Sequence, residues 1–351
     1  MSSKSAETAL QYWSTQGPIQ VTPDQGLINA TFLVGSPVAS VLQWVNPMFD
    51  ESIHVDIQNL TRRLCSKGLL TPELIPTRDG KLVVAAETGP NDIQGGCWRM
   101  LSFVPGTTVH QVQSHHMAHQ AGQLVGRFHS ALANWKEQPV APRRNAHDTP
   151  ARMTELEKAL SNADNHPLGD ISKELGEKIL QKWSKWNGEL DEPERWCHGD
   201  LKLSNLRFDR EAKQAICLLD FDTIGMLPIS LEMGDAWRSW CNPAGEDEPD
   251  RAYFDIDIFT QSAKGFFSTG PTLTMQEQTN LAPAIERICL ELAARFCADS
   301  INNCYFRENR TRWPQPGKHN WTRAAAQLNL ACSVRNQQNQ LETVIRNCIG
   351  G

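Results

Sequence analysis

The chain has 351 residues, of which 40% are hydrophobic and 21% charged, and its formal net charge at pH 7 is -6. This composition is typical of a globular protein with a sizeable core, and the length suggests about two domains. The negative charge balance provides no basic surface for nucleic acid or an anionic membrane, and no apolar stretch approaches the roughly 20 residues that a membrane-spanning helix needs.

The cysteines and the N-terminal residues suggest where the protein works. None of the ten cysteines belongs to a C-x-x-C pair, and several stand within apolar runs. Cysteines in such runs pack as small hydrophobic residues in the reduced form. The first residues lack the charged and then apolar layout of a signal peptide. We therefore expect a cytoplasmic protein that binds neither nucleic acid nor membrane, and the oligomeric state stays open.

The first hundred residues predict a small strand-rich lobe that begins with a short helix near 6–13. Short runs of β-branched and aromatic residues, bounded by turn residues, predict strands within 26–34 and at 40–45, 82–87 and 97–103. One longer helix is predicted at 50–67, because apolar residues recur there at helical spacing and Gly68 follows.

Beyond Val104-Pro-Gly106 the pattern becomes mainly helical. Helical periodicity predicts helices at 114–135, 151–162, 170–187, 250–268, 276–305 and 322–347. We expect an α+β protein with an N-terminal nucleotide-binding lobe at 1–103 and a larger, mainly helical C-terminal lobe at 104–351. A nucleotide would then lie in the cleft between the lobes, because pockets favour such boundaries.

The most informative motif is H-G-D-x-K-x-x-N, which runs from His198 to Asn205. A strand predicted at 215–219 leads from it to a second acidic cluster, Asp220-Phe-Asp222. The spacing matches the H-R-D-x-K-x-x-N form of a protein-kinase catalytic loop, with Gly199 in place of arginine. In this context the motif predicts a bilobal protein-kinase-like fold and a phosphotransferase.

Phosphoryl transfer needs a carboxylate that accepts the proton of the attacking hydroxyl, and oxygen ligands that hold Mg²⁺ against the phosphates of ATP. Asp200 fits the first role, and Asn205 and Asp220 fit the second. Lys202 could neutralise a phosphate oxygen. The turn from Gly26 to Asn29 could cover the phosphates with backbone N–H groups, although most such turns bind nothing. No Walker A motif and no G-x-G-x-x-G fingerprint is present.

Beyond this motif, the chain resembles the aminoglycoside phosphotransferase/choline kinase-like kinases along nearly its whole length. Within them it is most similar to the N-acetylhexosamine 1-kinase-like branch, which phosphorylates the anomeric hydroxyl of GlcNAc or GalNAc. Besides the catalytic loop, the segments that carry the resemblance are Gly26-Leu-Ile-Asn29, Val41-Leu-Gln-Trp-Val-Asn46, Trp98-Arg99, Phe103-Val-Pro-Gly106, Gly126-Arg-Phe-His129, His147-Asp-Thr-Pro-Ala-Arg152, Leu219-Asp-Phe-Asp-Thr223, Gly234-Asp-Ala-Trp-Arg238, Tyr305-Phe306 and His319-Asn-Trp-Thr-Arg-Ala324 with Gln327.

The resemblance implies roles for individual residues. Asp200 would be the catalytic base, Asn205 and Asp220 would bind magnesium, and Asp222 could add an electrostatic or second-metal role. Asp235 would brace the catalytic loop by accepting backbone hydrogen bonds, with a helix N-cap as the alternative.

The resemblance also implies which further residues lie near the two substrates. Trp237 could stack on a sugar ring, with core packing as the alternative. The residues expected on the nucleotide side are Gly26, Asn29, Gln43 and Phe103, and those expected behind the catalytic residues or at the acceptor are His198, Asp235, Trp237 and Arg238.

One position departs from the usual kinase pattern. Kinases carry a lysine on the third strand, paired with a helix glutamate, to hold the α- and β-phosphates. Here that place is taken by Gln43, whose neutral amide supplies no charge. The resembling branch tends to have glutamine there too, and Lys202 remains available.

Three functions stay open on this evidence. The first is an ATP- and Mg²⁺-dependent kinase whose acceptor is a small sugar, at the anomeric hydroxyl of an N-acetylhexosamine. The second keeps the fold but accepts an amino alcohol such as choline, an aminoglycoside or another sugar. A cationic acceptor needs carboxylates or an aromatic cage, and the stretch from Glu246 to Asp250 could supply carboxylates. The third is a nucleotide-binding pseudokinase, which Gln43 would favour.

Overall fold

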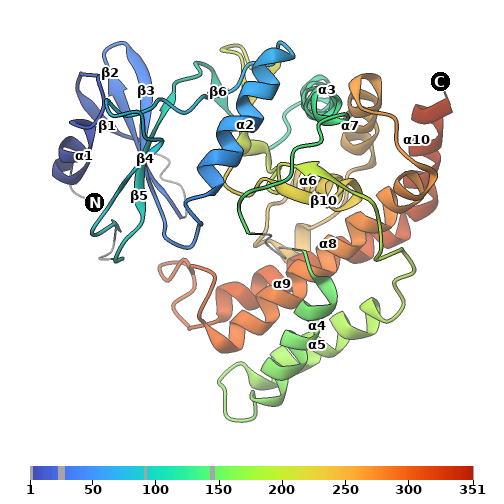
Figure 1. The fold of residues 1–351 in the computed structure, drawn as a ribbon. Helices are drawn as coiled ribbons and strands as arrows, with labels where there is room; N and C mark the ends of the chain where they lie inside the picture. The colour runs from blue at the N-terminus through green and yellow to red at the C-terminus, as the bar shows by residue number, and fades with distance from the viewer. Residues whose placement is uncertain (1–2, 23–27, 91–92, 143–146, 351) are drawn as a thin grey trace.

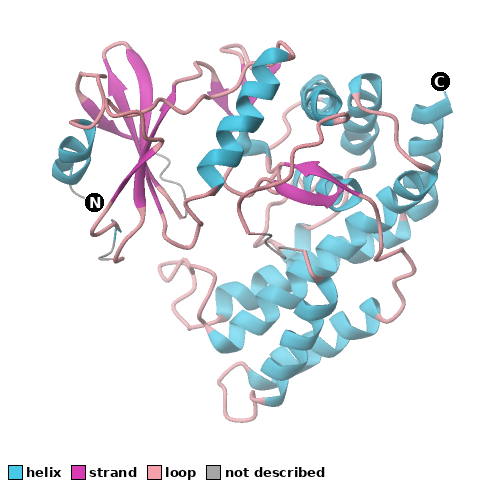
Figure 2. Ribbon diagram, in the orientation of Figure 1, coloured by secondary structure: helices cyan, strands magenta, loops and turns pink. Residues whose placement is uncertain are grey.

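The computed structural model describes residues 3–22, 28–90, 93–142 and 147–350, and it has a sheet at one end and most of the helices at the other (Figures 1 and 2). This arrangement is the expected α+β, bilobal layout. No helix within the described ranges combines the length and the apolarity that crossing a membrane requires.

A five-stranded antiparallel sheet forms the smaller end of the molecule, with strand order β1-β2-β3-β5-β4. Its strands are β1 (Ile19–Val21), β2 (Ala30–Gly35), β3 (Val38–Val45), β4 (Val83–Ala85) and β5 (Cys97–Ser102). Helix α1 (Ser3–Leu10) covers one face, where its Ala6 and Ala9 share a core with Phe32, Leu42 and Met100 of the sheet.

The opposite face of the sheet carries the intervening side chains, because successive side chains of a strand alternate between faces. This face points toward the helical lobe, since Arg99 on it donates to Asp222 there. Thr31, Gln43 and Arg99 are cross-strand partners on this face, on β2, β3 and β5 respectively. Polar side chains in register on three central strands are unusual for a buried face, and they mark the place where the sheet meets the rest of the molecule.

Helix α2 (Ile53–Ser66) lies in the chain between strands of the sheet but packs into the core of the helical lobe. The predicted apolar positions 53, 57, 60 and 64 are all buried there. Gly68 follows the helix with φ +78°, a left-handed conformation that favours glycine. The prediction for this helix is therefore confirmed, and its packing links the two ends of the molecule.

The larger lobe consists mainly of helices, and the long helix α8 packs against several of them. Its helices are α3 (His115–Leu132), α4 (Thr149–Ser161), α5 (Gly169–Trp183), α6 (Ile229–Trp240), α7 (Ile256–Thr269), α8 (Met275–Asn302), α9 (Lys318–Asn336) and α10 (Gln338–Gly350). The prediction of a single helix at 322–347 is wrong, because the helix is interrupted at Gln337, between α9 and α10. The side chain of Gln337 donates to the carbonyl of Phe254 at 2.9 Å, which fixes the break.

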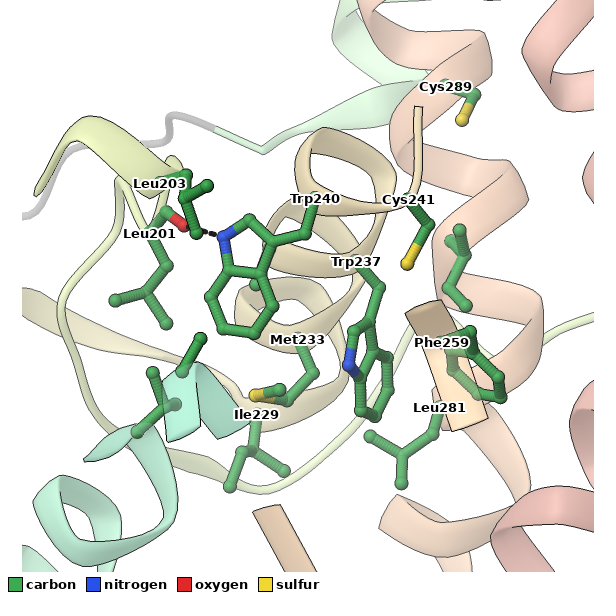
Figure 3. Close-up of a cluster of buried hydrophobic side chains, with 14 of the residues drawn as sticks. Leu201, Leu203, Ile229, Met233, Trp237, Trp240, Cys241, Phe259, Leu281 and Cys289 are labelled. Atoms are coloured by element: carbon green, nitrogen blue, oxygen red, sulfur yellow. Dashed lines mark hydrogen bonds between the residues drawn. The ribbon is translucent and has the colours of Figure 1, made fainter. Parts of the chain in front are cut away.

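Helix α6 was expected only in the alternative in which Asp235 caps a helix that starts at Ala236. It begins at Ile229 instead, and all but one of its residues are buried. Figure 3 shows Trp240 of this helix against Leu201 of the catalytic loop, and Trp237 beside Phe259. The indole N–H of Trp240 donates to the carbonyl of Leu201 at 2.7 Å, and Trp237 packs edge-on against Phe259 with ring centroids 5.0 Å apart.

Two small sheets hold the catalytic segment in place. Strand β7 (Glu194–Cys197) pairs with β10 (Gly225–Pro228). The other sheet has the order β6-β8-β9 and consists of β6 (Thr107–Thr108), β8 (Leu206–Phe208) and β9 (Ala215–Leu218). The loop that follows β7 and the loop that follows β9 therefore emerge side by side, and each carries one of the acidic motifs.

Candidate active site

The H-G-D turn at the start of the catalytic loop requires glycine. Gly199 has φ +81°, and a Cβ built on it would lie 2.4 Å from the carbonyl oxygen of Thr223. An arginine, as in the protein-kinase form of the motif, would not fit this conformation without moving the backbone. The hydroxyl of Thr223 also donates to the carbonyl of His198 at 2.9 Å, so the two acidic loops are bonded directly.

Asp200 lies on the wall of the large cavity and is held on one side only. Its Oδ2 accepts from Lys202 Nζ at 2.6 Å and from Asn205 Nδ2 at 3.0 Å. Its Oδ1 accepts no hydrogen bond from any described residue. Burial alone would lower the pKa of Lys202, but the Asp200 carboxylate raises it, so the lysine stays charged. One oxygen of Asp200 thus remains available to a hydroxyl in the cavity.

Glu232 of α6 braces the catalytic loop, a role that we expected of Asp235. Its two carboxylate oxygens accept from the backbone N–H groups of His198 at 2.7 Å and Gly199 at 2.9 Å. His129 Nε2 lies 3.6 Å from the same carboxylate. Burial alone would raise the pKa of Glu232, but His129 and the loop amide lower it, so Glu232 is ionised.

The brace expected at Asp235 is therefore wrong, and so is the N-cap alternative, since α6 begins at Ile229. Asp235 lies one turn beyond Glu232 and accepts from Arg238 Nη2 at 2.8 Å. Arg238 also donates to Glu246 at 3.1 Å. All three residues line the cavity, so Asp235 and Arg238 belong to its wall.

The ring of His198 connects the two loops as a neutral imidazole. Its Nε2 lies 2.8 Å from the carbonyl of Leu219, and its Nδ1 accepts from the N–H of Asp200 at 3.3 Å. Burial lowers the pKa of His198, which agrees with a ring that is protonated only at Nε2. His198 thus positions both Asp200 and the segment that leads into Asp220.

Asp220 and Asn205 are the residues that could hold a divalent cation. The N–H of Leu219 donates to the carbonyl of Asn205 at 2.8 Å, which brings the two loops together. Asp220 adopts φ +65°, a left-handed conformation that is rare for a residue other than glycine and frequent at functional sites. Solvent reaches its carboxylate, yet the walls around it and the charges of Asp222 and Asp200 raise its pKa to about 7. A bound cation would relieve this repulsion.

The donor set fits magnesium better than a transition metal. Within the described ranges, no three histidine, cysteine or carboxylate side chains group together in a way that could hold a metal ion. Mg²⁺ is usually bound by only one or two carboxylates together with substrate phosphates and water. Asp220 and the amide oxygen of Asn205 match that pattern, provided that a nucleotide supplies the remaining oxygens.

Asp222, which we expected as a further metal ligand, is instead engaged in an ion pair with Arg99 of β5. Both of its oxygens accept from the guanidinium, Oδ2 at 3.0 Å, and Oδ2 also accepts from Asn29 Nδ2 at 2.6 Å. Arg99 in turn donates to Gln43 Oε1 from Nε at 3.0 Å and from Nη2 at 2.8 Å. The sequence offered one hint of Arg99, the Trp98-Arg99 pair among the resembling segments.

None of the described residues that were predicted on the nucleotide side lies on the cavity wall. Gly26 lies outside the described residues. The other three, Asn29, Gln43 and Phe103, do not line the cavity. Asn29 binds Asp222 and the N–H of Asn46, while Gln43 binds Thr31 and Arg99. On this side the cavity is lined instead by Ile28, Asn46, Met48, Phe49, Thr107, Val109, His110 and Gln111.

The cavity has a volume of about 1350 Å³ and is lined from both lobes. Pockets for one drug-sized ligand are roughly 300–1,000 Å³, so this one has room for a nucleotide and an acceptor together. Trp237, expected at the acceptor, is fully buried and does not reach the cavity (Figure 3). It packs in the core because α6 turns its opposite face to the cavity.

The end of the cavity within the helical lobe is rich in arginine. It is formed by α6, α8, the segment after α8 and α9, and its arginines are Arg238, Arg295, Arg307 and Arg323. Arg238 is neutralised by Asp235 and Glu246. Arg295 lies over the rings of Tyr305 at 5.5 Å and Phe306 at 5.3 Å, and no described carboxylate pairs with it.

The fold and the loop geometry define a kinase-like phosphotransferase. A family model for the phosphotransferase enzyme family matches residues 21–261, which is more than half of the chain. The chain therefore belongs to this family. A comparison with curated proteins gave no match.

Solved structures of similar fold come from small-molecule kinases. A microcompartment-associated aminopropanol kinase has a TM-score of 0.64 at 16% identity, over 96% of this chain and 98% of that one. An amicoumacin kinase bound to AMP-PNP and Ca²⁺ has a TM-score of 0.59 at 13% identity, over 91% and 92%. An aminoglycoside phosphotransferase from Alicyclobacillus acidocaldarius has a TM-score of 0.58 at 14% identity, over 95% and 96%. These likenesses confirm the protein-kinase-like fold.

Proposed function

We propose that the protein is an ATP- and Mg²⁺-dependent kinase that phosphorylates a hydroxyl of a small sugar, and that this hydroxyl is the anomeric one of an N-acetylhexosamine. The observation that carries the proposal is the state of Asp200. One of its oxygens is fixed by Lys202 and Asn205, while the other is free at the wall of a cavity large enough for both substrates.

In the proposed reaction Asp200 Oδ1 accepts a hydrogen bond from the acceptor hydroxyl and takes its proton as the new P–O bond forms. The bond between the γ-phosphorus and the bridging oxygen breaks, and ADP leaves. Lys202 keeps Asp200 oriented and offers its charge to a phosphate oxygen. Asp220 and Asn205 would hold Mg²⁺, which would supply neutralisation of the charge on the transferred group.

The charges at the far end of the cavity support a neutral acceptor over a cationic one. No carboxylate among the described residues pairs with Arg295, and a protonated amine beside it would be repelled. Three of the four carboxylates in the acidic stretch that could have received a cation are already paired. Glu246 bonds Arg238 at 3.1 Å, Asp247 bonds Arg312 at 3.2 Å, and Glu248 bonds Arg251 at 2.8 Å. Guanidinium groups beside aromatic rings suit the hydroxyl and carbonyl oxygens of an acetylated sugar.

The sugar itself rests on the sequence resemblance, in particular the D-F-D-T and H-N-x-x-R-A-x-x-Q elements. The structural neighbours act on aminopropanol, amicoumacin and aminoglycosides, so an amino-bearing acceptor is the second candidate. Release of ADP should be measured across N-acetylhexosamines, other hexoses, amino alcohols and aminoglycosides. A response confined to amine acceptors would favour the second candidate, and no response to any acceptor would favour a pseudokinase.

The first prediction concerns the catalytic base. Asp200→Asn should lower kcat by about 10²–10⁴-fold, because an amide cannot accept the proton. The affinity for Mg-ADP, measured by calorimetry, should stay within about threefold of the wild type, since the substitution keeps the shape of the side chain.

Asp209→Asn is the matched control. Asp209 follows β8 in the turn between the two acidic motifs, and its carboxylate binds the N–H of Lys213 at 2.8 Å. Turnover in Asp200→Asn equal to that of Asp209→Asn would sink the assignment of the base.

A further inference from the structure

The contact between the sheet and the metal-binding loop runs through one buried ion pair. Arg99 and Asp222 are each only 2% exposed, and they approach from different lobes. Two parallel hydrogen bonds join the guanidinium to both carboxylate oxygens, which is the strongest geometry for such a pair. An unpaired charge at this depth would be costly, so each partner depends on the other.

The sheet presents the guanidinium in one orientation. Gln43 is the cross-strand partner of Arg99, and its Oε1 accepts from both Nε and Nη2. The Nε2 of Gln43 then donates to Thr31 Oγ1 at 3.0 Å, on the next strand. Gln43 is therefore used inside the sheet to hold Arg99, and this accounts for the missing charge at that position.

Asp222 connects Arg99 to the place where the nucleotide would lie. Asp222 lines the cavity, whereas Arg99 lies behind it and does not. Asp222 also follows Asp220 by two residues and receives a third hydrogen bond from Asn29. Any displacement of Asp222 would move the Asp220 carboxylate as well, because the two share one short loop.

Arg99 is the positively charged group that balances Asp222 in this contact. The other titratable groups that act on Arg99 and Asp222 are Asp220, Cys97 of β5 and His54 of α2, and among them only His54 could carry a positive charge. It is 1% exposed, and burial together with the neighbouring Arg99 lowers its pKa to about 4. His54 is therefore neutral, and Arg99 provides the charge that balances Asp222.

We infer that Arg99 is a positioning residue that replaces the third-strand lysine of kinases: from β5 it holds Asp222, and thereby Asp220, in the geometry that receives a magnesium nucleotide. The usual lysine pairs with a helix of its own lobe. Here the pair crosses from one lobe to the other, so the sheet and the cation site are connected directly. The inference rests on the proposed function, in that it assumes that a magnesium nucleotide occupies the cavity.

The test measures binding as well as turnover. Arg99→Met should weaken Mg-ADP binding at least tenfold by calorimetry and lower kcat, while the KM of the acceptor changes less than threefold. Arg99→Lys, which keeps one of the two bonds to Asp222, should recover part of the affinity. The double variant Gln43→Lys with Arg99→Met places a cation on the neighbouring strand in register, and it should also bind Mg-ADP more tightly than Arg99→Met alone.

Arg335→Met is the matched control, because Arg335 forms an ion pair with the buried Glu286 away from the cavity: its Nε donates to Oε1 at 3.0 Å, and its Nη2 lies 2.8 Å from Oε2. Its melting temperature should fall while its affinity for Mg-ADP stays unchanged. Wild-type affinity in Arg99→Met, with a melting temperature lowered as in Arg335→Met, would overturn the inference and leave Arg99 a packing residue. A wild-type protein that binds Mg-ADP but phosphorylates no acceptor would contradict only the proposed function. A wild-type protein that does not bind Mg-ADP would overturn both.

Discussion

At the scale of single residues, the site depends on carboxylates whose partners differ although their sequence contexts look alike. Asp220 and Asp222 are two residues apart, yet one is accessible to a cation and the other is bound on both oxygens by Arg99 and Asn29. Glu232 and Asp235 lie on one helix, yet only Glu232 holds the catalytic loop. The chemistry of each group is decided by its hydrogen-bond partners.

Glu232 leads to a prediction for activity and stability together. Glu232→Gln keeps the size of the side chain but can accept from only one of the two loop amides. The other N–H is left buried without a partner, which should reduce the free energy of unfolding by about 1–3 kcal/mol. The turnover number should also fall, because the same amides fix the loop that carries Asp200. Urea denaturation and steady-state kinetics measure the two effects.

The pH dependence of this variant has a defined sign. The folded-state pKa of Glu232 lies below its unfolded value of about 4.3, so its contribution is present above that pH and is lost as the pH falls through the folded-state pKa. The stability difference between wild type and Glu232→Gln should therefore be largest near neutral pH and shrink below about pH 4. Glu286→Gln, at a buried carboxylate of α8 that makes no hydrogen bond to the loop, should leave turnover unchanged. Equal turnover in the two variants would contradict the brace.

At the scale of elements, the arginine-rich end of the cavity, where we propose that the acceptor binds, is assembled from four separate parts of the chain, of which α9 supplies Arg323. Helix α6 supplies Asp235 and Arg238, helix α8 supplies Arg295, and the segment after α8 supplies Tyr305 and Phe306. The rings hold the guanidinium of Arg295 from below while leaving its charge unpaired. Such an arrangement favours oxygen-rich acceptors, because a guanidinium presents a fork of N–H donors.

Arg295→Met should therefore weaken recognition of the acceptor. The loss of hydrogen bonds from a charged group, about 1.5–3 kcal/mol, corresponds to a roughly tenfold to hundredfold lower kcat/KM for the sugar. Mg-ADP affinity should not change, since the other end of the cavity is intact. Arg346→Met on α10, outside the cavity, is the control. An unchanged kcat/KM in Arg295→Met would show that the acceptor binds elsewhere.

At the scale of the whole molecule, the two lobes are joined by more than a hinge. Helix α2 comes from the sequence of the smaller lobe but is buried in the core of the larger one. The ion pair of Arg99 with Asp222 adds a second connection across the cavity. The boundary predicted between residues 103 and 104 remains a prediction. Because α2 precedes this boundary in the chain but packs in the core of the larger lobe, the two lobes share part of their core.

We expect the two lobes to unfold together. Cys97 on β5 and Cys297 on α8 are natural probes, because burial raises the pKa of each thiol to about 12 and keeps it unreactive in the folded protein. Both thiols should become reactive at the same urea concentration when labelling is followed peptide by peptide. Labelling of Cys97 at a clearly lower urea concentration than Cys297 would show that the sheet unfolds independently.

Most of the fold was predictable because its elements have strong local patterns. The strands around Gln43 and Arg99 show β-branched and aromatic runs, and α2 shows apolar residues at helical spacing. Helix α6 was expected only from Ala236 onward, and its start at Ile229 was missed although Ile229, Met233 and Ala236 recur at helical spacing. The break between α9 and α10 escaped as well, since it depends on a long-range bond from Gln337 to Phe254.

The sequence by itself determined the class of protein, an α+β member of the phosphotransferase enzyme family, and it indicated the catalytic residues that we propose: Asp200, Lys202 and Asn205 in one loop and Asp220 in a second acidic motif. The spacing of residues within a motif is local, so a motif can be recognised without knowledge of the fold. Only the tertiary structure decided which groups meet across the chain. It paired Arg99 with Asp222, gave the loop brace to Glu232 instead of Asp235, and buried Trp237 away from the cavity. Such contacts join residues far apart in sequence, and their energy depends on distance and burial, which no local pattern contains.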